Sequence, residues 1–540
     1  MITRFIFITG GVSSSLGKGL SSAALASLLQ QQGYKVRLKK MDGYLNVDPG
    51  TMSPLQHGEV FVTDDGTEAD LDLGHYERFT SVNSRSSDST TMGKIYSSLI
   101  TKERNGKFEG ATVQVIPHVT DEVKEFILKD TGDEDFVLCE IGGTVGDIEN
   151  LPFLEAVRQL RLELGSERTM FIHLALVPYL EHAQEIKTKP AQKSVKELLG
   201  FGIQPDLLLC RCTHQLTQEL KAKLGLFCNI NPERIITAID VKTIYQVPVE
   251  YQNEKLDKQV CLYFNIKFNE LTKNPWQSVV QKILHPKKLV KIAIIGKYTK
   301  LLDAYKSLIE SLSHGAIANN CMVNISWIDA VDEKYLDINI LNDELSKVDG
   351  VIVPGGFGEN GAKTKMQAIR FVREKNIPFL GICFGMQLAV IEAAQNLLNL
   401  KEASTTEFGT TPDPVVYLLT KWVKESKIEE RDAGSQLGGT MRLGSYPCLI
   451  QKDSLAYKIY GTEVIHERHR HRYEINKDYK DALEKVGLVF SGSSPDLLLP
   501  EIVEYPNHRW FVGVQFHPEL ISRPLSPHPL FQSFIKAIAF

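Results

Sequence analysis

The sequence predicts an α/β protein built as two three-layer domains, each with a largely parallel sheet between layers of helices. Short, continuous apolar runs alternate with helical patterns through the first half of the chain. Continuous runs are typical of parallel strands, because helices cover such sheets on both faces. A polar, proline-broken stretch over residues 267–289 interrupts the pattern, and a new apolar run then begins the second half. A length of 540 residues accommodates two large domains of this class.

Each expected strand is a run of β-branched, aromatic or other apolar residues. In the first half these runs cover residues 5–9, 36–39, 136–141, 170–177, 207–210 and 235–239. The second half opens with a run over residues 289–296, while residues 404–440 have the composition of a surface insertion. We therefore expect a first domain over residues 1–266, a linker over 267–289 and a second domain over 290–540.

Composition excludes several classes of protein. The hydrophobic fraction of 43%, the charged fraction of 24% and the net charge of −5 are ordinary for a globular chain and favour neither nucleic acid nor an anionic membrane as a partner. The basic run over residues 466–472 lacks stacking aromatics, so we expect no nucleic-acid binding there. No apolar run approaches 20 residues and no signal peptide is recognisable, so no membrane span is expected. The 8 cysteines lack zinc-type pairing and suit a reducing cytoplasm.

The strongest catalytic signal is a cysteine on a sharp turn in the second half. Cys383 lies between Gly381 and Gly385, after an apolar strand and before a helical run. This is the cysteine form of the nucleophile elbow, and a helix dipole behind it favours the reactive thiolate. Downstream, His517 and Glu519 complete a thiol acyl-transfer triad as base and orienter. The alternative is a structural buried cysteine. The residues resemble the class I glutamine amidotransferases, which release ammonia from glutamine through a cysteinyl thioester.

A second signal is the glycine-rich loop over residues 10–19, which follows the first strand and precedes a helix. Backbone N–H groups of such a loop bind phosphates, and Lys18 would reach the β/γ-phosphates, so we predict a P-loop-type parallel sheet. Gly19 stands where a P-loop has the Ser or Thr that contacts magnesium. Magnesium must then use other oxygen ligands, for which Asp72 and Glu140 are candidates. The alternative is a simple turn with solvated acids.

The motifs occur in the order found in the CTP synthase family, and the similarity runs from residue 9 to about residue 534. Residues 48–62 and 438–443 carry the longest similar runs, and the two lysines of residues 187–192 also match the family. The resemblance implies a cytoplasmic ligase of pyrimidine biosynthesis that uses ATP, Mg²⁺ and glutamine, or free ammonia, to convert UTP to CTP. It implies a 4-phosphorylated UTP intermediate, a cysteinyl-glutamyl thioester, activation by GTP, inhibition by CTP and a homotetramer.

The resemblance also assigns residues to each ligand. The ATP site would comprise Ser15, Leu16, Gly17, Lys18, Gly19, Leu20, Asp72, Ile239, Asp240 and Val241, with Asp72 and Glu140 as metal ligands. The UTP and CTP positions would be Ser14, Asp147, Ile148, Glu149, Lys187, Thr188, Lys189, Pro190, Ala191, Gln192 and Lys223. The glutamine pocket would comprise Gly356, Phe384, Gly385, Met386, Gln387, Glu407 and Arg472, with oxyanion donors at Gly356 and Phe384.

The chain departs from the family pattern at several of these positions. Phe384 replaces a usual Leu, and Asn360 stands where the family has an arginine that the resemblance associates with GTP. Gly43 replaces a usual Pro, and Ala191 and Lys193 replace the commoner Thr and His. Two other functions are compatible with the motifs: another ATP-dependent amidoligase fused to a glutaminase, and a non-catalytic scaffold that retains the fold. Intact triad and phosphate-loop residues argue against the scaffold.

Overall fold

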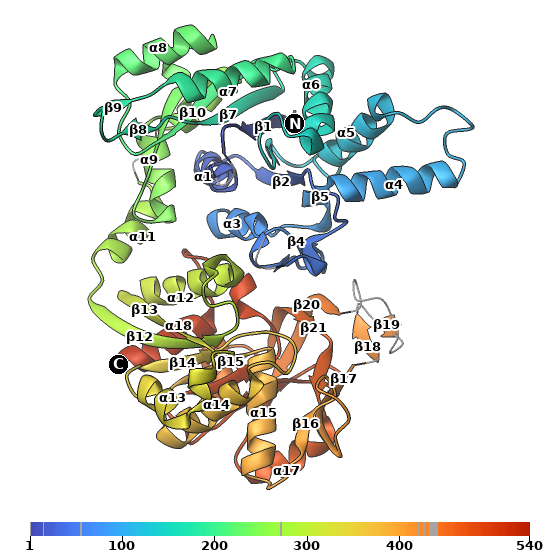
Figure 1. Ribbon diagram of the computed structural model, residues 1–540, viewed down its shortest axis with the longest axis vertical. Helices are drawn as coiled ribbons and strands as arrows, with labels where there is room; N and C mark the ends of the chain where they lie inside the picture. Colours follow the sequence, from blue (N-terminus) through green and yellow to red (C-terminus); the bar gives the residue numbers. More distant parts are fainter. Residues whose placement is uncertain are drawn as a thin grey trace. The chain divides into compact units, whose positions relative to one another are not determined.

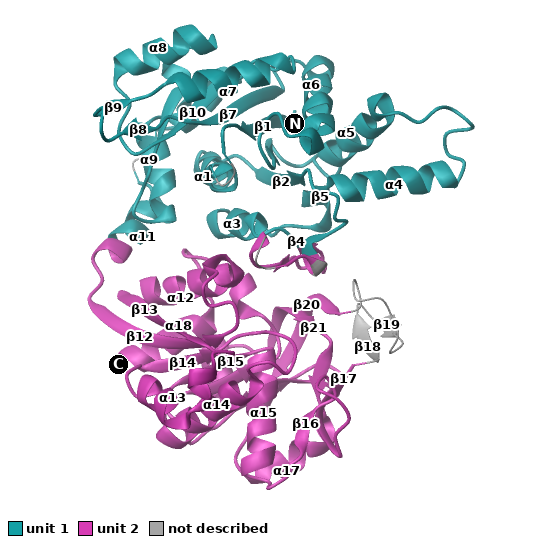
Figure 2. Ribbon diagram, viewed as in Figure 1, with its two compact units in different colours: residues 1–49, 69–281 teal, residues 50–68, 282–540 magenta. Residues whose placement is uncertain are grey.

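The computed structural model describes residues 2–13, 16–53, 57–270, 273–419, 421–424, 427–430 and 441–540. Its internal contacts divide the chain into two compact units (Figure 2). Unit 1 comprises residues 1–49 and 69–281, and unit 2 comprises residues 50–68 and 282–540. A short segment from the N-terminal half of the sequence, residues 50–68, therefore packs as part of unit 2.

Unit 1 contains a seven-stranded parallel sheet in the order β11-β10-β7-β1-β6-β2-β5 (Figure 1). Its strands are β1 (Arg4–Gly10), β2 (Val36–Asp42), β5 (Ser89–Thr91), β6 (Phe136–Ile141), β7 (Thr169–Leu176), β10 (Leu207–Cys212) and β11 (Ile235–Ile239). Its main helices are α1 (Lys18–Gln31), α3 (Asp72–Phe79), α4 (Met92–Arg104), α5 (Thr120–Leu128), α6 (Leu151–Leu164), α7 (Lys189–Gly200), α8 (Gln218–Cys228), α9 (Val247–Asn253) and α10 (Leu256–Tyr263). All six predicted strands are present. The sequence missed β5, because its three hydroxyl residues form no apolar run.

Unit 2 contains a nine-stranded mixed sheet in the order β13-β12-β14-β15-β25-β24-β23-β20-β21. The first five strands in this order pair parallel, and each of the last four pairs antiparallel with the strand before it. The strands are β13 (Cys321–Asp329), β12 (Lys288–Gly296), β14 (Gly350–Val353), β15 (Phe379–Ile382), β25 (Phe511–Val514), β24 (Pro500–Glu504), β23 (Val489–Ser493), β20 (Arg442–Ile450) and β21 (Val464–His471). Helices α12 (Lys306–Ala318) and α18 (Pro529–Ala539) share one hydrophobic core with the sheet. Helices α13 (Ile338–Leu345), α14 (Ala362–Lys375) and α15 (Phe384–Asn396) share a second core. The predicted three-layer α/β class is confirmed in both units.

Two stretches that read as polar in the sequence contain buried structure. Residues of the expected linker form α11 (Pro275–Leu284), in which Trp276 is fully buried and donates from Nε1 to Ser27 at 2.9 Å. The expected surface insertion begins with β16 (Ala403–Thr405) and β17 (Asp413–Leu418), which form a small sheet with β22 (Tyr473–Ile475). Val415 and Val416 of β17 are fully buried, so this part of the insertion prediction was wrong. Further along, β18 (Lys421–Lys424) and β19 (Lys427–Glu430) pair as a hairpin, and residues 431–440 lie outside the description.

Candidate active sites in the two units

The turn around Cys383 has the strained geometry of a nucleophile elbow. Cys383 connects β15 to α15 with φ 52° and ψ −103°, a left-handed backbone that non-glycine residues rarely adopt. A Cβ on Gly385 would lie 2.0 Å from the Val353 carbonyl oxygen of β14, and a Cβ on Gly381 would lie 2.9 Å from the Gly385 carbonyl carbon. Glycines are therefore required on both sides of the cysteine, because the turn is too tight for side chains there.

His517 and Glu519 follow β25, the strand beside β15. His517 Nδ1 is hydrogen-bonded to Glu519 Oε1 at 2.8 Å. Burial alone would lower the pKa of His517, but Glu519 and Cys383 outweigh it and raise that pKa to about 10. The structure thus brings the three residues together, and the histidine is held as an imidazolium next to Cys383.

The three residues line a cavity of about 560 Å³ in unit 2. This size suits a small-molecule substrate, since ligand pockets usually span roughly 300–1,000 Å³. The remaining lining residues are Gly50, Met52, Gly58, Glu59, Val60, Lys297, Tyr298, Ala304, Tyr305, Leu308, Pro354, Gly355, Gly356, Phe357, Lys365, Met441, Arg470, Arg472 and Leu520. Gly356 and Arg472, which the sequence assigned to the glutamine pocket, are among them.

The side chains of four other residues assigned to this pocket support the cavity and do not line it. Phe384 and Met386 are buried in the core that α14 and α15 share. The side-chain amide of Gln387 donates to a backbone carbonyl of β22 at 2.9 Å. The Glu407 carboxylate accepts from the Gly358 N–H at 2.6 Å, which fixes the loop that carries Gly356. Sequence position alone could not separate lining residues from these supports.

Sequence reasoning missed the contribution of residues 50–68 to the same cavity. The Glu59 carboxylate accepts from the Ser307 N–H at 2.8 Å, and the Glu59 N–H donates to the Asp303 carbonyl at 2.9 Å. Asp64 forms an ion pair with Arg468 at 2.6 Å. The one signal in the sequence was the long run over residues 48–62 that resembles the family. That run did not reveal which domain these residues pack against.

The basic run over residues 466–472 is explained by these contacts. It forms β21 and its continuation, and Arg468 is fully buried against the side chains of Asp64 and Phe61. Arg470 pairs with Glu68 at 2.8 Å and donates to the Gly50 carbonyl at 3.3 Å. Two of the arginines therefore bind residues 50–68 of the same chain.

In unit 1, the glycine-rich loop leads from β1 into α1 as predicted. Gly17 has φ 97° at the start of the helix, a conformation that glycine tolerates. The Lys18 ammonium donates to the Gly143 carbonyl at 2.5 Å, and burial lowers the pKa of Lys18 against the opposing pull of Glu140. Ser14 and Ser15 lie outside the described residues.

Asp72 and Glu140 meet at a lysine that the sequence reasoning missed. Lys40 Nζ lies 2.6 Å from Asp72 Oδ2, 3.0 Å from Glu140 Oε1 and 3.4 Å from Asp42 Oδ1. Burial lowers the pKa of Lys40, but these carboxylates outweigh it and raise it well above the usual value. Within the described ranges, no three His, Cys, Asp or Glu side chains are grouped to hold a metal. Two carboxylates that share one cation nevertheless fit a shared magnesium ion. The signal in the sequence was the run of charged residues in β2, whose burial on every position the sequence did not reveal.

Gly19 has a structural reason to replace the usual Ser or Thr. A Cβ on Gly19 would lie 2.2 Å from Asp72 Oδ1. The carboxylate therefore occupies the space that a side chain at position 19 would fill. Asp72 can thus supply an oxygen where a standard P-loop supplies a hydroxyl.

Arg211 of β10 joins two segments that the sequence assigned to ATP. Its guanidinium pairs with Asp240 at 2.6 Å and donates to the Leu16 carbonyl at 3.0 Å. Ile239 ends β11, and Val241 follows Asp240 in the next turn. The phosphate loop and the turn after β11 are therefore adjacent, as one nucleotide site requires. Leu20 lies in the first turn of α1.

The described positions assigned to UTP and CTP lie at the N-terminus of α7, on α8 and in the turn before α6. Lys187, whose ammonium pairs with Glu185, precedes α7 and Lys189 begins it. The neighbouring positions Thr188, Ala191 and Gln192 are buried, and Pro190 is half-buried. Lys223 is exposed on α8, which packs against α7. Asp147, Ile148 and Glu149 form the turn before α6, where Ile148 is 80% exposed and Asp147 accepts the Thr144 N–H at 2.7 Å.

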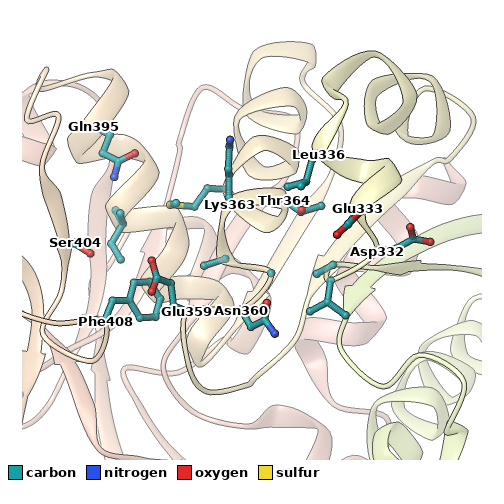
Figure 3. A pocket seen from close by; sticks show the side chains of 16 residues that line it. Asp332, Glu333, Leu336, Glu359, Asn360, Lys363, Thr364, Gln395, Ser404 and Phe408 are labelled. Carbon is teal, nitrogen blue, oxygen red and sulfur yellow. The ribbon is translucent and has the colours of Figure 1, made fainter.

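Asn360 lines a second cavity in unit 2, of about 710 Å³, which does not include Cys383 (Figure 3). It lies with Glu359 on the turn that enters α14; Figure 3 shows Glu359 beside Phe408, with Asp332, Glu333 and Leu336 on the other side of Asn360. The same turn carries Gly356 and Gly358 a few residues earlier. The backbone of this turn therefore connects position 360 to Gly356 in the lining of the Cys383 cavity.

Comparison with known proteins assigns both halves of the chain. Residues 4–266 match the family described as CTP synthase N-terminus, and residues 300–537 match the family described as glutamine amidotransferase class-I. Proteins named CTP synthase from Paramagnetospirillum magneticum and Rhodospirillum rubrum are each 60% identical over 536 and 538 residues, covering 99% of this chain and 98% of theirs. A solved glutaminase domain of Trypanosoma brucei CTPS with bound acivicin is 35% identical, with a TM-score of 0.42, and covers 46% of this chain and 93% of its own. No helix in the described part of the chain has the length and apolar character needed to cross a membrane.

Proposed function

The chain belongs to the CTP synthase family and converts UTP to CTP with nitrogen from glutamine; we propose that the two sites described above divide this reaction between them. The cavity around Cys383 would release ammonia, and the phosphate loop of unit 1 would activate UTP with ATP. The hydrogen-bonded pair of His517 and Glu519 beside an elbow cysteine is the observation that carries the first assignment.

In the glutaminase half, Cys383 Sγ attacks the side-chain carbonyl carbon of glutamine. His517, oriented by Glu519, gives a proton to the leaving nitrogen, so that ammonia departs and a γ-glutamyl thioester remains. His517 then takes a proton from water as it attacks the thioester, which breaks the carbon–sulfur bond, yields glutamate and releases Cys383 Sγ beside the reprotonated histidine. The backbone N–H groups of Gly356 and Phe384 would hold the oxyanion, and loss of one such donor typically costs about 10²–10³ in rate.

In the synthetase half, the γ-phosphoryl group of ATP is transferred to the 4-oxygen of UTP. This step depends on positioning and on neutralising charge, for which Lys18 supplies a fixed cation. Asp72 and Glu140 would hold Mg²⁺, which when bound neutralises charge on the phosphate oxygens. Ammonia then attacks C4 of the activated base, a proton is lost from nitrogen, and inorganic phosphate leaves with its oxygen.

The nucleotide assignments rest on charge and on position. The half-buried Lys187 and the exposed Lys189 and Lys223 would provide cations for the triphosphate of UTP. Asp147 and Glu149 would provide acceptors for hydroxyl or base N–H groups. The same positions would bind inhibitory CTP.

We also propose Mg²⁺ as the metal, GTP as activator of the glutaminase half and a homotetramer. We propose a cytoplasmic location as well, and the eight free thiols support that location.

The test is a turnover assay of the purified full-length chain. UTP, ATP and Mg²⁺ are supplied with glutamine or with ammonium, with and without GTP, and CTP formation is followed by absorbance. The proposal expects CTP from either nitrogen source, and glutamate release only with glutamine. Absence of CTP under all conditions from a folded protein would contradict it, as would amidation of a different acceptor.

A further inference from the structure

Lys365 has no role in the mechanism above, yet it is buried in the wall of the Cys383 cavity. It lies in the first turns of α14, is only 1% exposed, and lines the cavity together with Cys383. Burying an ammonium group is costly unless a partner compensates. Among the described residues, no carboxylate lies within 4.0 Å of its nitrogen.

The position of its nitrogen relates Lys365 to the oxyanion donors. A Cβ built on Gly356 would lie 3.6 Å from Lys365 Nζ and 3.7 Å from Phe384 Cδ1. The same nitrogen lies 5.1 Å from the centre of the Phe384 ring, within cation–π range. The ammonium is thus next to the two residues whose N–H groups would bind the oxyanion.

We propose that Lys365 stabilises the oxyanion of glutamine hydrolysis, as a cation behind the N–H groups of Gly356 and Phe384. This inference rests on the glutaminase function proposed for the cavity. The negative charge that would offset the buried ammonium exists only while the tetrahedral intermediate does. Such a charge favours the transition state over the ground state, which is the condition for raising kcat.

The surroundings of the lysine are consistent with this role. Burial, with a smaller contribution from Lys297, lowers the pKa of Lys365 to about 7. Lys297 itself is occupied, because its ammonium donates to the Phe357 carbonyl at 2.8 Å. Glu407, which lies between β16 and β17, accepts the Gly358 N–H through its carboxylate. These two side chains hold the loop that carries Gly356, and the nearest atom to a Cβ built on Gly356 is Lys365 Nζ.

The test compares wild type with K365M, which keeps an unbranched side chain one heavy atom shorter and removes the charge. K363M is the matched control, since Lys363 is exposed on the same helix and lines the other cavity (Figure 3). We expect kcat for glutamate release to fall about 10- to 100-fold in K365M, below the cost of losing an N–H donor, with KM changed less than about three-fold. K363M should match wild type.

Two further readouts separate charge from packing. Alkylation of Cys383 by iodoacetamide, located by peptide mass spectrometry, needs the thiolate and no oxyanion, so its rate should be similar in K365M and wild type. The ratio of wild-type to K365M kcat should be largest below pH 7 and should shrink above it, because the lysine loses its charge there. K365R, which stays charged, should exceed K365M at high pH.

Each outcome decides the proposal. Equal kcat in K365M and wild type would overturn it. A loss of alkylation rate as large as the loss of kcat would also overturn it, because Lys365 would then act on the Cys383 thiolate or on the packing of the cavity and not on the oxyanion. A ratio that does not change with pH would also contradict it. If wild type itself releases no glutamate, the proposed function fails instead, and the two failures are distinguishable.

Discussion

The two candidate sites differ in what their charged groups bind before any ligand arrives. In unit 2, the charges that the reaction uses are already paired with each other, since His517 is hydrogen-bonded to Glu519 and held as an imidazolium beside Cys383. In unit 1, Asp72 and Glu140 are bound to Lys40. The glutaminase site is therefore preformed, whereas the synthetase site must exchange partners when nucleotide and metal bind. Variants in unit 2 should act locally, and variants in unit 1 should alter ligand requirements.

The largest effect is expected from Cys383→Ala. Synthesis of CTP from glutamine should fall at least about 10⁴-fold, because loss of a nucleophile removes the covalent pathway. Synthesis from ammonium should stay within about two-fold of wild type, because unit 1 keeps its own groups. Parallel assays with the two nitrogen sources provide the check. Loss of both activities in a folded variant would contradict separable sites.

Glu140→Gln and Lys18→Ala should produce the reverse pattern. Each removes charge that the phosphoryl transfer needs, so synthesis should fall by about 10³-fold from either nitrogen source. Basal glutamine hydrolysis should persist, and glutamate release measured beside CTP formation shows this. A Glu140→Gln variant with wild-type synthesis would remove Glu140 from the metal site.

Gly19→Ala tests whether Asp72 takes the place of the P-loop hydroxyl. The added methyl would lie within 2.2 Å of Asp72 Oδ1 and displace the carboxylate. We expect synthesis to fall by about 10²-fold, since small displacements of a reacting group have effects of this size. The Mg²⁺ concentration for half-maximal rate should rise. Gly200→Ala is the control, because a Cβ there meets no atom within 4 Å. Unchanged Mg²⁺ dependence in the Gly19 variant would be inconsistent with this account.

Asp64→Asn tests the attachment of residues 50–68 to unit 2. It removes the charged partner of the fully buried Arg468, so the free energy of unfolding should drop by about 1–2 kcal/mol, a value reduced because Asp64 is 41% exposed. Urea denaturation measures it. Asp343→Asn, which breaks an exposed pair with Lys347, should lower the free energy of unfolding by less than Asp64→Asn does. An equal decrease in the free energy of unfolding in the two variants would show that the Asp64–Arg468 pair stabilises the protein no more than an exposed pair does.

Asn360→Arg should have the smallest effect, and only on regulation. Asparagine cannot make the bidentate, charged contacts of an arginine. Stimulation of glutamine-dependent synthesis by GTP should rise by about two- to ten-fold in the variant, with ammonium-dependent synthesis unchanged. The measurement is the ratio of rates with and without GTP. Identical ratios would show that position 360 does not affect GTP activation.

The sequence predicted the regular parts of this molecule and missed the long-range ones. The strand runs, the Cys383 turn and the Lys18 loop follow from local patterns of apolar residues and glycine. The carboxylate cluster around Lys40 depends on β2, β6 and α3 meeting, which no local pattern records. Residues 50–68 likewise join the Cys383 cavity through ion pairs with Arg468 and Arg470, whose partners are some 400 positions away in the sequence. Burial of Trp276 was hidden for the same reason, because its polar neighbours resembled a linker.

The central claim is that nitrogen released at Cys383 is joined to UTP by the same enzyme. Wild type and Cys383→Ala are each incubated with UTP, ATP, Mg²⁺ and glutamine labelled with ¹⁵N at the side-chain amide, and the nucleotide product is analysed by mass spectrometry. We predict CTP one mass unit heavier from wild type, none from the variant with glutamine, and heavy CTP again from the variant with ¹⁵N-ammonium. Heavy CTP formed from glutamine by Cys383→Ala, or no CTP from wild type, would contradict the account.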